Sequence, residues 1–398
     1  NFIISGHDVS SGGLITTLLE LCFSENGLGA DIDFSDVGDQ KTVDLLFCEN
    51  PAIVFQGKGT IEKILREKKI NFFKIGKVDR TGNLKIKNNR DQLNLCVEKY
   101  RDLWFKKSYL MDIHQSGITK AKERFENFKK QPLVFNFPEN FSGNLSTSNQ
   151  KKINAAIIRD KGSNSEREMA YMMDLCGFKV RDVHMTDLIE GRETLEDIQL
   201  LVAVGGFSNS DVLGSAKGWA GAFKYNTKAK AALENFFSRT DTLSLGVCNG
   251  CQLFIELGLL YTNHIQKPKM MHNKSGKFEC IFTAVNIKPS SSIMLKGLEG
   301  SILGIWAAHG EGRFSFPKAE INYQIPAKYL YEGYPSNPNG SDFNAAMLVS
   351  DNGRHLVMMP HLERSTFPWN WGHYPNNRKD EVSPWILAFE NAYNWLKK

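Results

Sequence analysis

The chain has 398 residues, of which 41% are hydrophobic and 23% charged, and its formal net charge is +5. At roughly 100–200 residues per domain, this length predicts two or three domains with the composition of an ordinary globular protein. No stretch approaches the ~20 apolar residues of a spanning helix, and the lysines are dispersed, so we expect neither a membrane nor a nucleic acid as partner.

The cysteine content bears on the cellular compartment, and the first residues bear on whether the chain is a whole protein. Seven cysteines show no disulfide-like spacing, which favours a reducing compartment and a cytoplasmic location. The chain starts at Asn1 and enters an apolar run at residues 2–4. We therefore expect a piece of a longer protein.

The first predicted domain covers residues 1–104. Its segment 6–13 (GHDVSSGG) precedes an apolar stretch of helical spacing at 14–23. The pattern then predicts a strand at 52–56, a helix at 61–69, and strands at 72–78 and 83–86 around a turn at Thr81-Gly82. This is a compact α/β unit, too small to hold a large active site alone.

Residues 105–150 are predicted to be a helical connection and linker. A charged helical pattern covers about 110–130, and 132–150 is rich in Asn, Ser, Pro and Gly. That composition is typical of a connection that runs over a surface.

The third predicted domain, residues 151–398, alternates near-continuous apolar runs with helical patterns. Strands are expected at 153–158, 179–183, 200–204 and 243–247, and helices at 166–176 and 251–257. Apolar runs of this kind are buried on both faces of a parallel sheet. The pattern therefore predicts a doubly wound, mostly parallel α/β sheet with its site at the carboxyl ends of the strands.

The segment 246–252 (GVCNGCQ) lies where a buried strand is expected to meet a helix. The spacing Gly-x-Cys-x-Gly is that of a nucleophile elbow, in which glycines permit a strained turn that lifts the central side chain above the sheet. A helix N-terminus and a neighbouring imidazolium both favour the reactive thiolate form of a cysteine. We interpret Cys248 as a nucleophile.

Two other interpretations apply to a cysteine in this segment. Most lone cysteines are small buried hydrophobes. Cys248 and Cys251 also form a Cys-x-x-Cys pair, which occurs in redox and zinc sites, but no second pair of ligands accompanies it. We expect Cys251 to pack on the first helical turn and no metal to bind.

A cysteine nucleophile needs a base and a group that orients the base. Two His-x-Glu segments qualify, His309-Gly310-Glu311 and His361-Leu362-Glu363, and the second follows a strand-like run at 355–359. Residues two apart in an extended segment point to the same side, so Glu363 can lie behind the His361 ring. Either histidine can equally be an ordinary surface residue, and the pattern does not decide between the pairs.

The glycine pair of Gly205-Gly206-Phe207-Ser208 follows the strand at 200–204. Its N–H groups, together with the amide of Asn249, can hold a developing oxyanion. An ordinary turn accounts for the same residues equally well.

Longer segments of the third region help to decide between these interpretations of the cysteine, histidine and glycine residues. They are residues 162–169 (GSNSEREM), 182–185 (DVHM), 205–208 (GGFS), 211–219 (DVLGSAKGW), 245–252 (LGVCNGCQ), 309–313 (HGEGR), 337–341 (NPNGS) and 359–364 (MPHLER). In this order they resemble the class I glutaminase domain of the formylglycinamide ribonucleotide amidotransferases, a family also called phosphoribosylformylglycinamidine synthases. The resemblance implies the flavodoxin-like fold of class I glutamine amidotransferases.

The resemblance also implies roles for particular residues. It assigns a catalytic triad to Cys248, His361 and Glu363. It places the side chain of the substrate L-glutamine near Gly206, Phe207 and Gln252. Asn209-Ser210 stands where the family usually has Tyr and a small residue, and Leu362 stands where it has Pro. These departures leave the geometry of the glutamine loop open.

The first region, through its segment 7–13, resembles the C-terminal α/β subdomain of the synthetase module of the same family, which is like the C-terminal domain of aminoimidazole ribonucleotide synthetase. Ser11 replaces an Asp of that motif. The resemblance implies that upstream synthetase domains bind ATP and Mg²⁺ and that the glutaminase itself needs no cofactor. The enzyme would use glutamine-derived ammonia to convert formylglycinamide ribonucleotide to the formylglycinamidine in purine biosynthesis.

Two other classes of function remain to be separated by experiment. One is a cysteine hydrolase or peptidase on the same fold, because the elbow alone does not specify glutamine. The other is a non-catalytic interaction module that keeps a relic triad.

Overall fold

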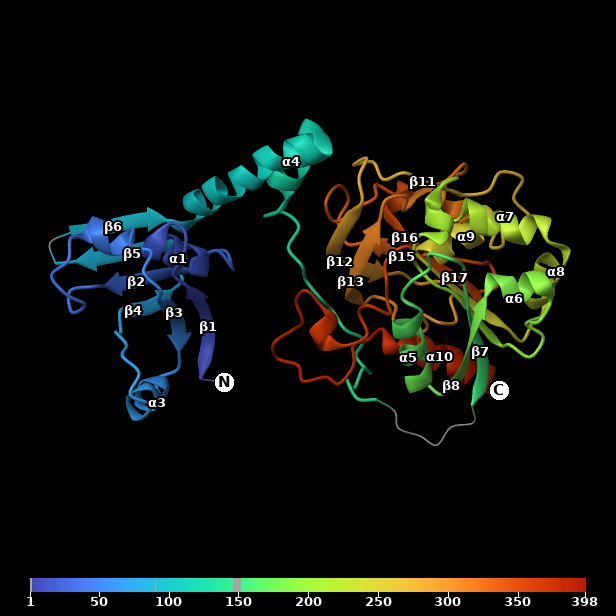
Figure 1. Ribbon diagram of the computed structural model, residues 1–398, viewed down its shortest axis with the longest axis horizontal. Helices are drawn as coiled ribbons and strands as arrows, with labels where there is room; N and C mark the ends of the chain where they lie inside the picture. The colour runs from blue at the N-terminus through green and yellow to red at the C-terminus, as the bar shows by residue number, and fades with distance from the viewer. Residues whose placement is uncertain (1, 90, 146–151) are drawn as a thin grey trace. The chain divides into compact units, whose positions relative to one another are not determined.

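The computed structural model describes residues 2–89, 91–145 and 152–398. By its contacts the chain divides into two compact units, Asn1–Asp112 and Ile113–Lys398, and each is described by itself (Figure 1). The domain boundaries expected near residues 104 and 150 stay predictions. Within the described residues, no helix has the length and apolar character that crossing a membrane requires.

The first unit is built on a sheet in the order β4-β2-β5-β6, covered by the helix α1 (Gly13–Cys22). Its strands are β2 (Gly29–Asp33), β4 (Gly76–Asp79), β5 (Asn83–Asn88) and β6 (Asp91–Cys96). Strand β5 alternates, burying Leu84 and Ile86 and exposing Lys85 and Lys87. The buried pair packs with Leu18 of α1 in one core, as expected for a sheet with one covered face.

Smaller elements complete this unit. The strands β1 (Ile3–Asp8) and β3 (Ile53–Gly57) pair antiparallel, and the short helices are α2 (Thr42–Leu46) and α3 (Ile61–Glu67). The α/β character and the elements predicted at 14–23, 52–56 and 61–69 are confirmed within one or two residues. The sequence did not reveal β1, β2 or β6.

The turn at Thr81-Gly82 joins β4 to β5, but these strands are not neighbours. Strand β2 lies between them, antiparallel to β4 and parallel to β5. The strand predicted at 72–78 is also shorter than expected and begins only at Gly76. A turn signal shows where the chain reverses, whereas the partner of each strand is set by which apolar faces become buried together.

A long helix leads into the predicted connecting segment. Helix α4 (Val97–Asn127) begins before the helical pattern predicted at about 110–130, ends within it, and is interrupted at Gly117, whose φ is 74° and ψ is 160°. The described residues that follow, 128–145, are held by the second unit. The N–H of Asn136 donates to the carbonyl of Ile302 at 2.9 Å, and Phe135 and Phe137 lie against Trp371 with ring centroids 5.2 and 5.6 Å apart. The remainder of the predicted linker, 146–150, lies outside the described residues.

The second unit is organised around a sheet in the order β13-β12-β15-β16-β17-β10-β9-β7-β8. Its parallel part consists of β17 (His355–Met358), β10 (Leu243–Val247), β9 (Leu200–Ala203), β7 (Ile153–Arg159) and β8 (Phe178–His184). Every residue of β9 and β10 is buried. The predicted doubly wound parallel sheet is confirmed here, at the strands that carry the candidate residues.

Helices cover both faces of this parallel part (Figure 1). One group contains α5 (Glu166–Leu175) and α10 (Ile386–Leu396), which contact each other. The other group contains α6 (Met185–Glu190), α7 (Lys217–Tyr225), α8 (Thr227–Ser238) and α9 (Asn249–Glu256). Strands buried by helices on both sides account for the near-continuous apolar runs in the sequence.

Antiparallel strands extend the sheet beyond β17, and the sequence did not reveal them. They are β12 (Glu279–Ile287), β13 (Ile302–His309), β15 (Gln324–Tyr329) and β16 (Ala345–Val349). A short ribbon of β11 (Lys269–Met271) and β14 (Arg313–Ser315) lies outside the sheet. This extension matters because it carries two segments that line the cavity beside the elbow, one just before β12 and one at the end of β13.

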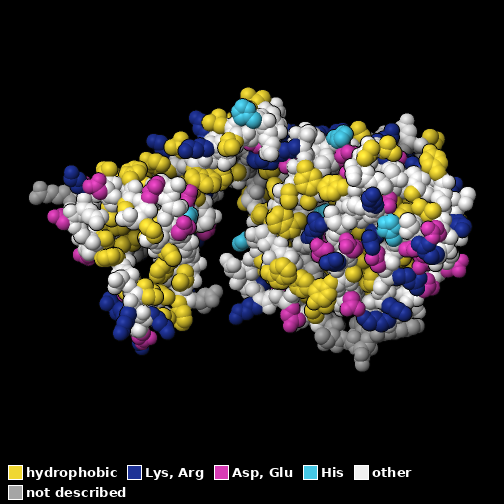
Figure 2. Space-filling model, viewed as in Figure 1, with side chains coloured by type: hydrophobic (Ala, Val, Ile, Leu, Met, Phe, Trp, Pro, Cys, Tyr) yellow, Lys and Arg dark blue, Asp and Glu magenta, His cyan; other side chains and the backbone are white. Residues whose placement is uncertain are grey.

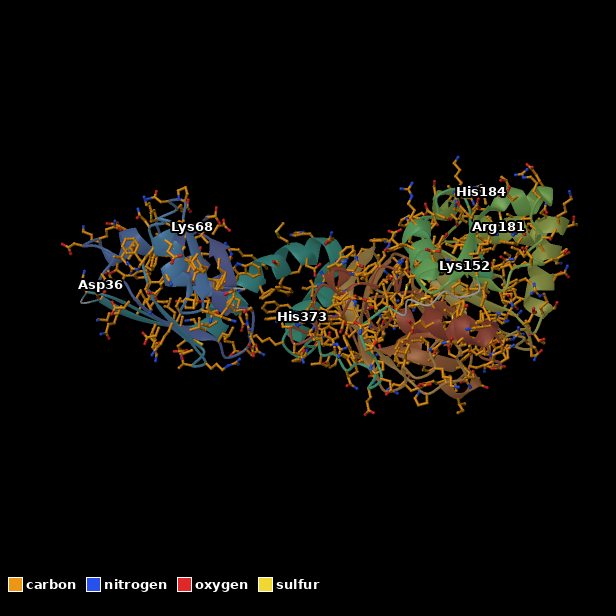
Figure 3. The ribbon with its side chains drawn as sticks, turned by 90° about the horizontal axis from the view of Figure 1, so that it is seen from below. Asp36, Lys68, Lys152, Arg181, His184 and His373 are labelled. Carbon is orange, nitrogen blue, oxygen red and sulfur yellow. The ribbon has the colours of Figure 1, made fainter. Side chains whose placement is uncertain are left out.

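The outer edge of the parallel part is protected by charge. Strand β8 is the edge strand, and its Arg181 pairs with Glu193 at 2.6 Å and with Asp197 at 2.8 Å. Figure 3 shows Arg181 and His184 on the outside of the unit. Charged side chains on an edge strand discourage pairing with other chains. Positive and negative side chains are interspersed over the visible face of the unit (Figure 2).

Candidate active site

Cys248 occupies the turn between β10 and α9, with φ 52° and ψ −105°. The glycines on either side allow the close packing that this turn requires. A Cβ on Gly250 would lie 2.0 Å from the carbonyl oxygen of Ala203, and one on Gly246 would lie 2.7 Å from the carbonyl oxygen of Gly250. The structure thus forms the strained strand-to-helix elbow expected from Gly-x-Cys-x-Gly.

The elbow is fixed to the neighbouring strand. The N–H of Cys248 donates to the carbonyl of Met358 at 2.8 Å, which continues the β10–β17 pairing. The sulfur faces the end of β13, where Sγ lies 3.7 Å from the carbonyl oxygen of Ala308. Helix α9 begins at the next residue, so its N-terminal N–H groups, which carry partial positive charge, lie beside the thiol.

His361 and Glu363 are brought together with Cys248 by the end of β17. The two side chains are buried, and His361 Nδ1 lies 2.6 Å from Glu363 Oε1. The N–H of His361 donates to the carbonyl of Trp306 at 2.7 Å, which fixes the backbone of the segment. A Cβ on Gly205 would lie 2.8 Å from His361 Cε1 and 3.4 Å from Cys248 Cβ, so the imidazole and the cysteine share the space above this glycine.

The pKa values of the buried His361 and Glu363 side chains depend on each other. Burial by itself would lower the pKa of His361, but the charge of Glu363, together with the interactions with Cys248 and the hydrogen bond to Glu363, outweighs burial and raises that pKa to about 10. Burial would likewise raise the pKa of Glu363, and the His361 charge and hydrogen bond keep it below its usual value. The site therefore holds an imidazolium flanked by a carboxylate at neutral pH.

His309 occupies a different environment. It is buried, and its Nε2 accepts a hydrogen bond from Asn339 Nδ2 at 3.0 Å. Burial, together with the charge of His361, lowers the pKa of His309 to about 3, so its ring is neutral. Glu311 does not lie behind this ring and instead accepts the N–H of Ser215 at 3.3 Å. Of the two His-x-Glu segments, only His361-Leu362-Glu363 forms a hydrogen-bonded pair.

The predicted oxyanion and glutamine residues come together as a set of linked loops. The N–H of Phe207 donates to the carbonyl of Gly162 at 2.9 Å, which anchors the loop after β9. Asn249 Oδ1 accepts the N–H of Ser208 at 3.2 Å, and its Nδ2 donates to Gln252 Oε1 at 3.0 Å. Gln252 Nε2 then donates to the carbonyl of Glu311 at 2.9 Å. The side chains of Asn249 and Gln252 therefore join three loops around the nucleophile.

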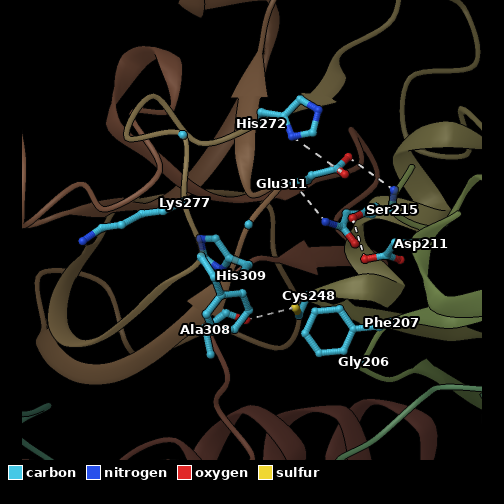
Figure 4. A pocket seen from close by; sticks show the side chains of 14 residues that line it. Gly206, Phe207, Asp211, Ser215, Cys248, His272, Lys277, Ala308, His309 and Glu311 are labelled. Carbon is cyan, nitrogen blue, oxygen red and sulfur yellow. Dashed lines mark hydrogen bonds and ion pairs between the residues drawn. The ribbon is translucent and has the colours of Figure 1, made fainter. Parts of the chain in front are cut away.

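A cavity of about 260 Å³ opens beside Cys248 (Figure 4). Gly206, Phe207 and Gln252, which the family resemblance places near the glutamine side chain, line this cavity. Cys248 lines it as well, and so do His309, Gly310 and Glu311, which the sequence analysis had considered only as a candidate base segment. Sequence reasoning gave no role to the other lining residues, which are Asp211, Ser215, His272, Gly276, Lys277, Phe278 and Ala308. Asp211 and Glu311 belong to segments that carried the family resemblance, so a charged residue inside such a segment was the available signal.

Cys251 lies apart from this cavity. It is fully buried in the first turn of α9, where burial raises the pKa of its thiol well above the usual value. Both it and Cys248 are free thiols. Among residues 2–89, 91–145 and 152–398, no group of three or more His, Cys, Asp or Glu side chains is arranged to hold a metal ion. The assignment of catalytic and binding roles to individual residues stays a prediction.

Comparison with known families gives two matches. Residues 152–396 match the family of CobB/CobQ-like glutamine amidotransferase domains. Residues 1–88 match the C-terminal domain of AIR synthase related proteins. Both matches confirm the fold classes predicted for the two regions.

The chain is also similar to longer curated proteins. A probable phosphoribosylformylglycinamidine synthase of Arabidopsis thaliana, named as chloroplastic/mitochondrial, is 37% identical and matches 100% of this chain but 30% of its own length. The Homo sapiens phosphoribosylformylglycinamidine synthase is 36% identical and matches 99% of this chain and 32% of its own length. The chain therefore spans about a third of these relatives. A solved structure of PurLQS from Thermotoga maritima covers 62% of this chain at 25% identity, with a TM-score of 0.48.

Proposed function

This chain belongs to the family of CobB/CobQ-like glutamine amidotransferase domains, and we propose that it hydrolyses L-glutamine to glutamate and ammonia through a thioester on Cys248. The observation that carries the proposal is the placement of Cys248. A strained elbow holds it at one end of a cavity and beside a buried, hydrogen-bonded His361–Glu363 pair. This is the arrangement of nucleophile, base and orienting group that acyl transfer requires.

In the first half of the reaction, the Cys248 sulfur attacks the side-chain amide carbon of glutamine. A C–S bond forms, and the oxyanion is stabilised by backbone N–H groups at Gly206 and Asn249, both beside the nucleophile. His361 gives its proton to the departing nitrogen, the C–N bond breaks, and ammonia leaves. The raised pKa of His361 supports this role, because a protonated imidazole is then present at neutral pH.

In the second half, His361 is neutral and accepts a proton from water. The hydroxyl attacks the thioester carbon, the C–S bond breaks, and glutamate leaves. Glu363 keeps Nδ1 of the ring protonated and oriented throughout, which leaves Nε2 for proton transfer. No metal or cofactor takes part in these steps.

We extend the proposal to the longer protein on the basis of the relatives' names. The ammonia would serve ATP-dependent conversion of formylglycinamide ribonucleotide to the formylglycinamidine, with ATP and Mg²⁺ bound by synthetase domains of the same enzyme. The match of residues 1–88 to an AIR synthase related C-terminal domain supports a partner module of this kind. The cytoplasmic location stays a prediction.

The test combines turnover with covalent labelling. We expect the purified chain to release ammonia from L-glutamine and to be labelled at Cys248 by 6-diazo-5-oxo-L-norleucine, an electrophilic glutamine analogue. A chain that takes no label and releases no ammonia would support the non-catalytic alternative. Cleavage of peptide bonds at a rate comparable to glutamine hydrolysis would instead support a peptidase. Repeating the assay with the upstream synthetase part present measures how far that part activates the glutaminase.

A further inference from the structure

One buried segment that carried the family resemblance has no role in the proposed reaction. Residues 337–341 (NPNGS) lie between β15 and β16. Asn337 Oδ1 accepts the N–H groups of Gly340 at 2.9 Å and Ser341 at 3.1 Å, which closes a tight turn. The side chain of Asn339, in the same turn, is fully buried. Buried polar groups are normally satisfied by hydrogen bonds, so the partners of Asn339 indicate what the segment does.

The partners of Asn339 fix the orientation of its amide group. Its Oδ1 accepts the N–H of Ser341 at 3.0 Å and the Ser341 hydroxyl at 2.7 Å. Because a backbone N–H can only donate, the atom that faces it must be the amide oxygen. Nδ2 therefore lies on the other side, where it donates to His309 Nε2 at 3.0 Å and to the Tyr329 hydroxyl oxygen at 3.0 Å. Both hydrogens of the amide nitrogen are used.

This orientation determines which nitrogen of His309 carries the proton. Asn339 Nδ2 can only donate, so His309 Nε2 must accept with its lone pair, and the proton of the ring is on Nδ1. Within the described residues, His309 Nδ1 has no hydrogen-bond partner. A second proton on the ring would therefore create a buried charge that no acceptor stabilises, in agreement with the lowered pKa of His309.

Ionisable groups on several elements surround His309. Glu279 of β12 lies opposite it in the sheet and pairs with Arg124 at 3.3 Å. Tyr329 of β15 shares the amide of Asn339 and is neutral, because burial raises its pKa. The ionisable residues that line the cavity with His309 are Asp211, Cys248, His272, Lys277 and Glu311. In the part of the chain that the structure describes, only Asn339 forms a hydrogen bond with the ring, so this residue decides its protonation.

His309 lies close enough to His361 for their charges to interact. The charge of His361 contributes to lowering the pKa of His309, and because the interaction is mutual, a charge on His309 would lower the pKa of His361. The proposed reaction uses an imidazolium at His361 twice. It protonates the departing nitrogen, and it forms again when the ring accepts a proton from water. A second imidazolium beside it would disfavour both steps.

We propose that Asn339 is a positioning residue that fixes His309 as the neutral tautomer with its proton on Nδ1, so that His361 alone carries the imidazolium of the site. The inference rests on the proposed function, which gives His361 its role. Asn339 does not line the cavity and acts only through His309. The NPNGS segment thereby connects the loop after β15 to the charge state of the active site.

The first test measures the tautomer in the wild-type chain. Nitrogen NMR of protein with isotope-labelled histidine rings distinguishes protonated from unprotonated ring nitrogens, and the His309 signals are identified by their loss in His309→Gln. We expect a proton on Nδ1 and none on Nε2, at neutral and at mildly acidic pH. In Asn339→Asp, which has the same shape, an ionised carboxylate can only accept, so His309 Nε2 should carry a proton.

The second test separates a charge effect from a structural one. In Asn339→Asp the carboxylate raises the pKa of His309, so the ring faces the cavity as a second imidazolium. We expect kcat for L-glutamine to fall about tenfold with little change in KM, because proton transfer at His361 is impaired and binding is not. Adding His309→Gln should restore kcat to within about threefold of His309→Gln alone, since Gln stays neutral and can donate to the carboxylate.

The matched control places the same substitution elsewhere. Asn88 is a buried asparagine of the first unit, and Asn88→Asp should leave kcat unchanged. A double variant no more active than Asn339→Asp would overturn the charge argument, because a second substitution does not repair a structural loss. If Asn339→Asp fails to fold, the wild-type spectrum decides: a proton on His309 Nε2 at neutral pH would overturn the inference without any glutamine turnover. Absence of Cys248-dependent ammonia release would overturn the proposed function, and with it the catalytic role of the network.

Discussion

At the scale of single residues, the two cysteines of the elbow segment have opposite surroundings although they are three positions apart. Cys248 lines a cavity and faces a buried imidazolium, and Cys251 is packed at 0% exposure in the core of the unit. Reactivity of a thiol depends on access and on nearby positive charge. Only Cys248 has both access to a cavity and a positive charge nearby.

This contrast predicts the effects of two alanine substitutions. Cys248→Ala should abolish glutamine hydrolysis, with a loss on the order of 10⁶ in turnover, because the members of a triad act as a unit. Cys251→Ala should keep most of the activity, since it removes only a buried packing group. The measurement is ammonia release by each variant at saturating glutamine. If Cys251 proved equally essential, the redox-pair interpretation would be favoured instead.

The two buried histidines differ in the same way. His361→Ala removes the group that donates and accepts protons and should reduce kcat far more than His309→Ala, whose ring is neutral and bonded to Asn339. Glu363→Gln should fall between them, because it keeps the shape of the side chain and loses the charge that supports the imidazolium. Steady-state kinetics of the three variants check this order, and comparable losses at His309 and His361 would refute it.

At the scale of elements, the site depends on a close approach between α9 and the sheet. Gly250 lies against the carbonyl of Ala203 in β9, and Gly246 at the end of β10 lies against Gly250. Any side chain at these positions forces the helix away from the strands. Because the helix and the nucleophile are consecutive in the chain, displacement of α9 also displaces Cys248 relative to His361.

We therefore expect Gly250→Ala to destabilise the protein and to reduce activity together. Overpacking in a close-packed core costs about 1–3 kcal/mol, which corresponds to a loss of several degrees in Tm. The matched control is Gly221→Ala in α7, where the nearest atom to an added Cβ is 4.0 Å away. In that helix interior alanine should raise stability by roughly 0.5–1 kcal/mol. Thermal unfolding of the two variants should therefore shift in opposite directions, and a shift in the same direction would contradict the account of the elbow.

At the scale of the whole molecule, the chain covers about a third of the length of the related synthases. Its first unit is a small α/β unit, and the sequence contains no Gly-x-x-x-x-Gly-Lys-Ser/Thr phosphate-binding loop. The second unit holds the candidate glutaminase residues. The chain therefore contains candidate residues for glutamine hydrolysis but no such phosphate-binding loop for the proposed ATP-dependent step.

We predict that this chain alone makes no formylglycinamidine product, even with ATP, Mg²⁺, the ribonucleotide and free ammonia. Supplying ammonia bypasses the glutaminase, so the assay isolates the ATP-dependent step. We also expect slow glutamine turnover, because contacts from a loaded synthetase site usually activate glutaminases of this type. ATP-dependent formation of the product by this polypeptide would overturn the proposal that the ATP-dependent step takes place on other domains of the longer enzyme.

The parallel strands and the elbow could be predicted from local sequence. Long apolar runs such as β9 and β10 have no polar face, and the glycines that flank Cys248 are the residues that a tight strand-to-helix turn requires, so local pattern and local chemistry agree there. The antiparallel strands β12, β13, β15 and β16 were missed, and so was β2. Part of their pairing joins strands that are not consecutive in the chain, since β12 pairs with β15 and β2 lies between β4 and β5. Strand pairing is a property of which faces become buried together, and one segment alone does not show it.

The arrangement of the candidate residues, in contrast, depends on the tertiary fold. His309-Gly310-Glu311 and His361-Leu362-Glu363 have the same spacing, but only in the second segment does the carboxylate contact the imidazole ring. In the first segment, Glu311 accepts the N–H of Ser215, and His309 is hydrogen-bonded to Asn339. Asp211 and Glu311 lie 100 residues apart in the sequence and meet in one cavity. Spacing along a chain fixes which residues can share a side of one element, whereas contacts between loops depend on the whole sheet that carries them.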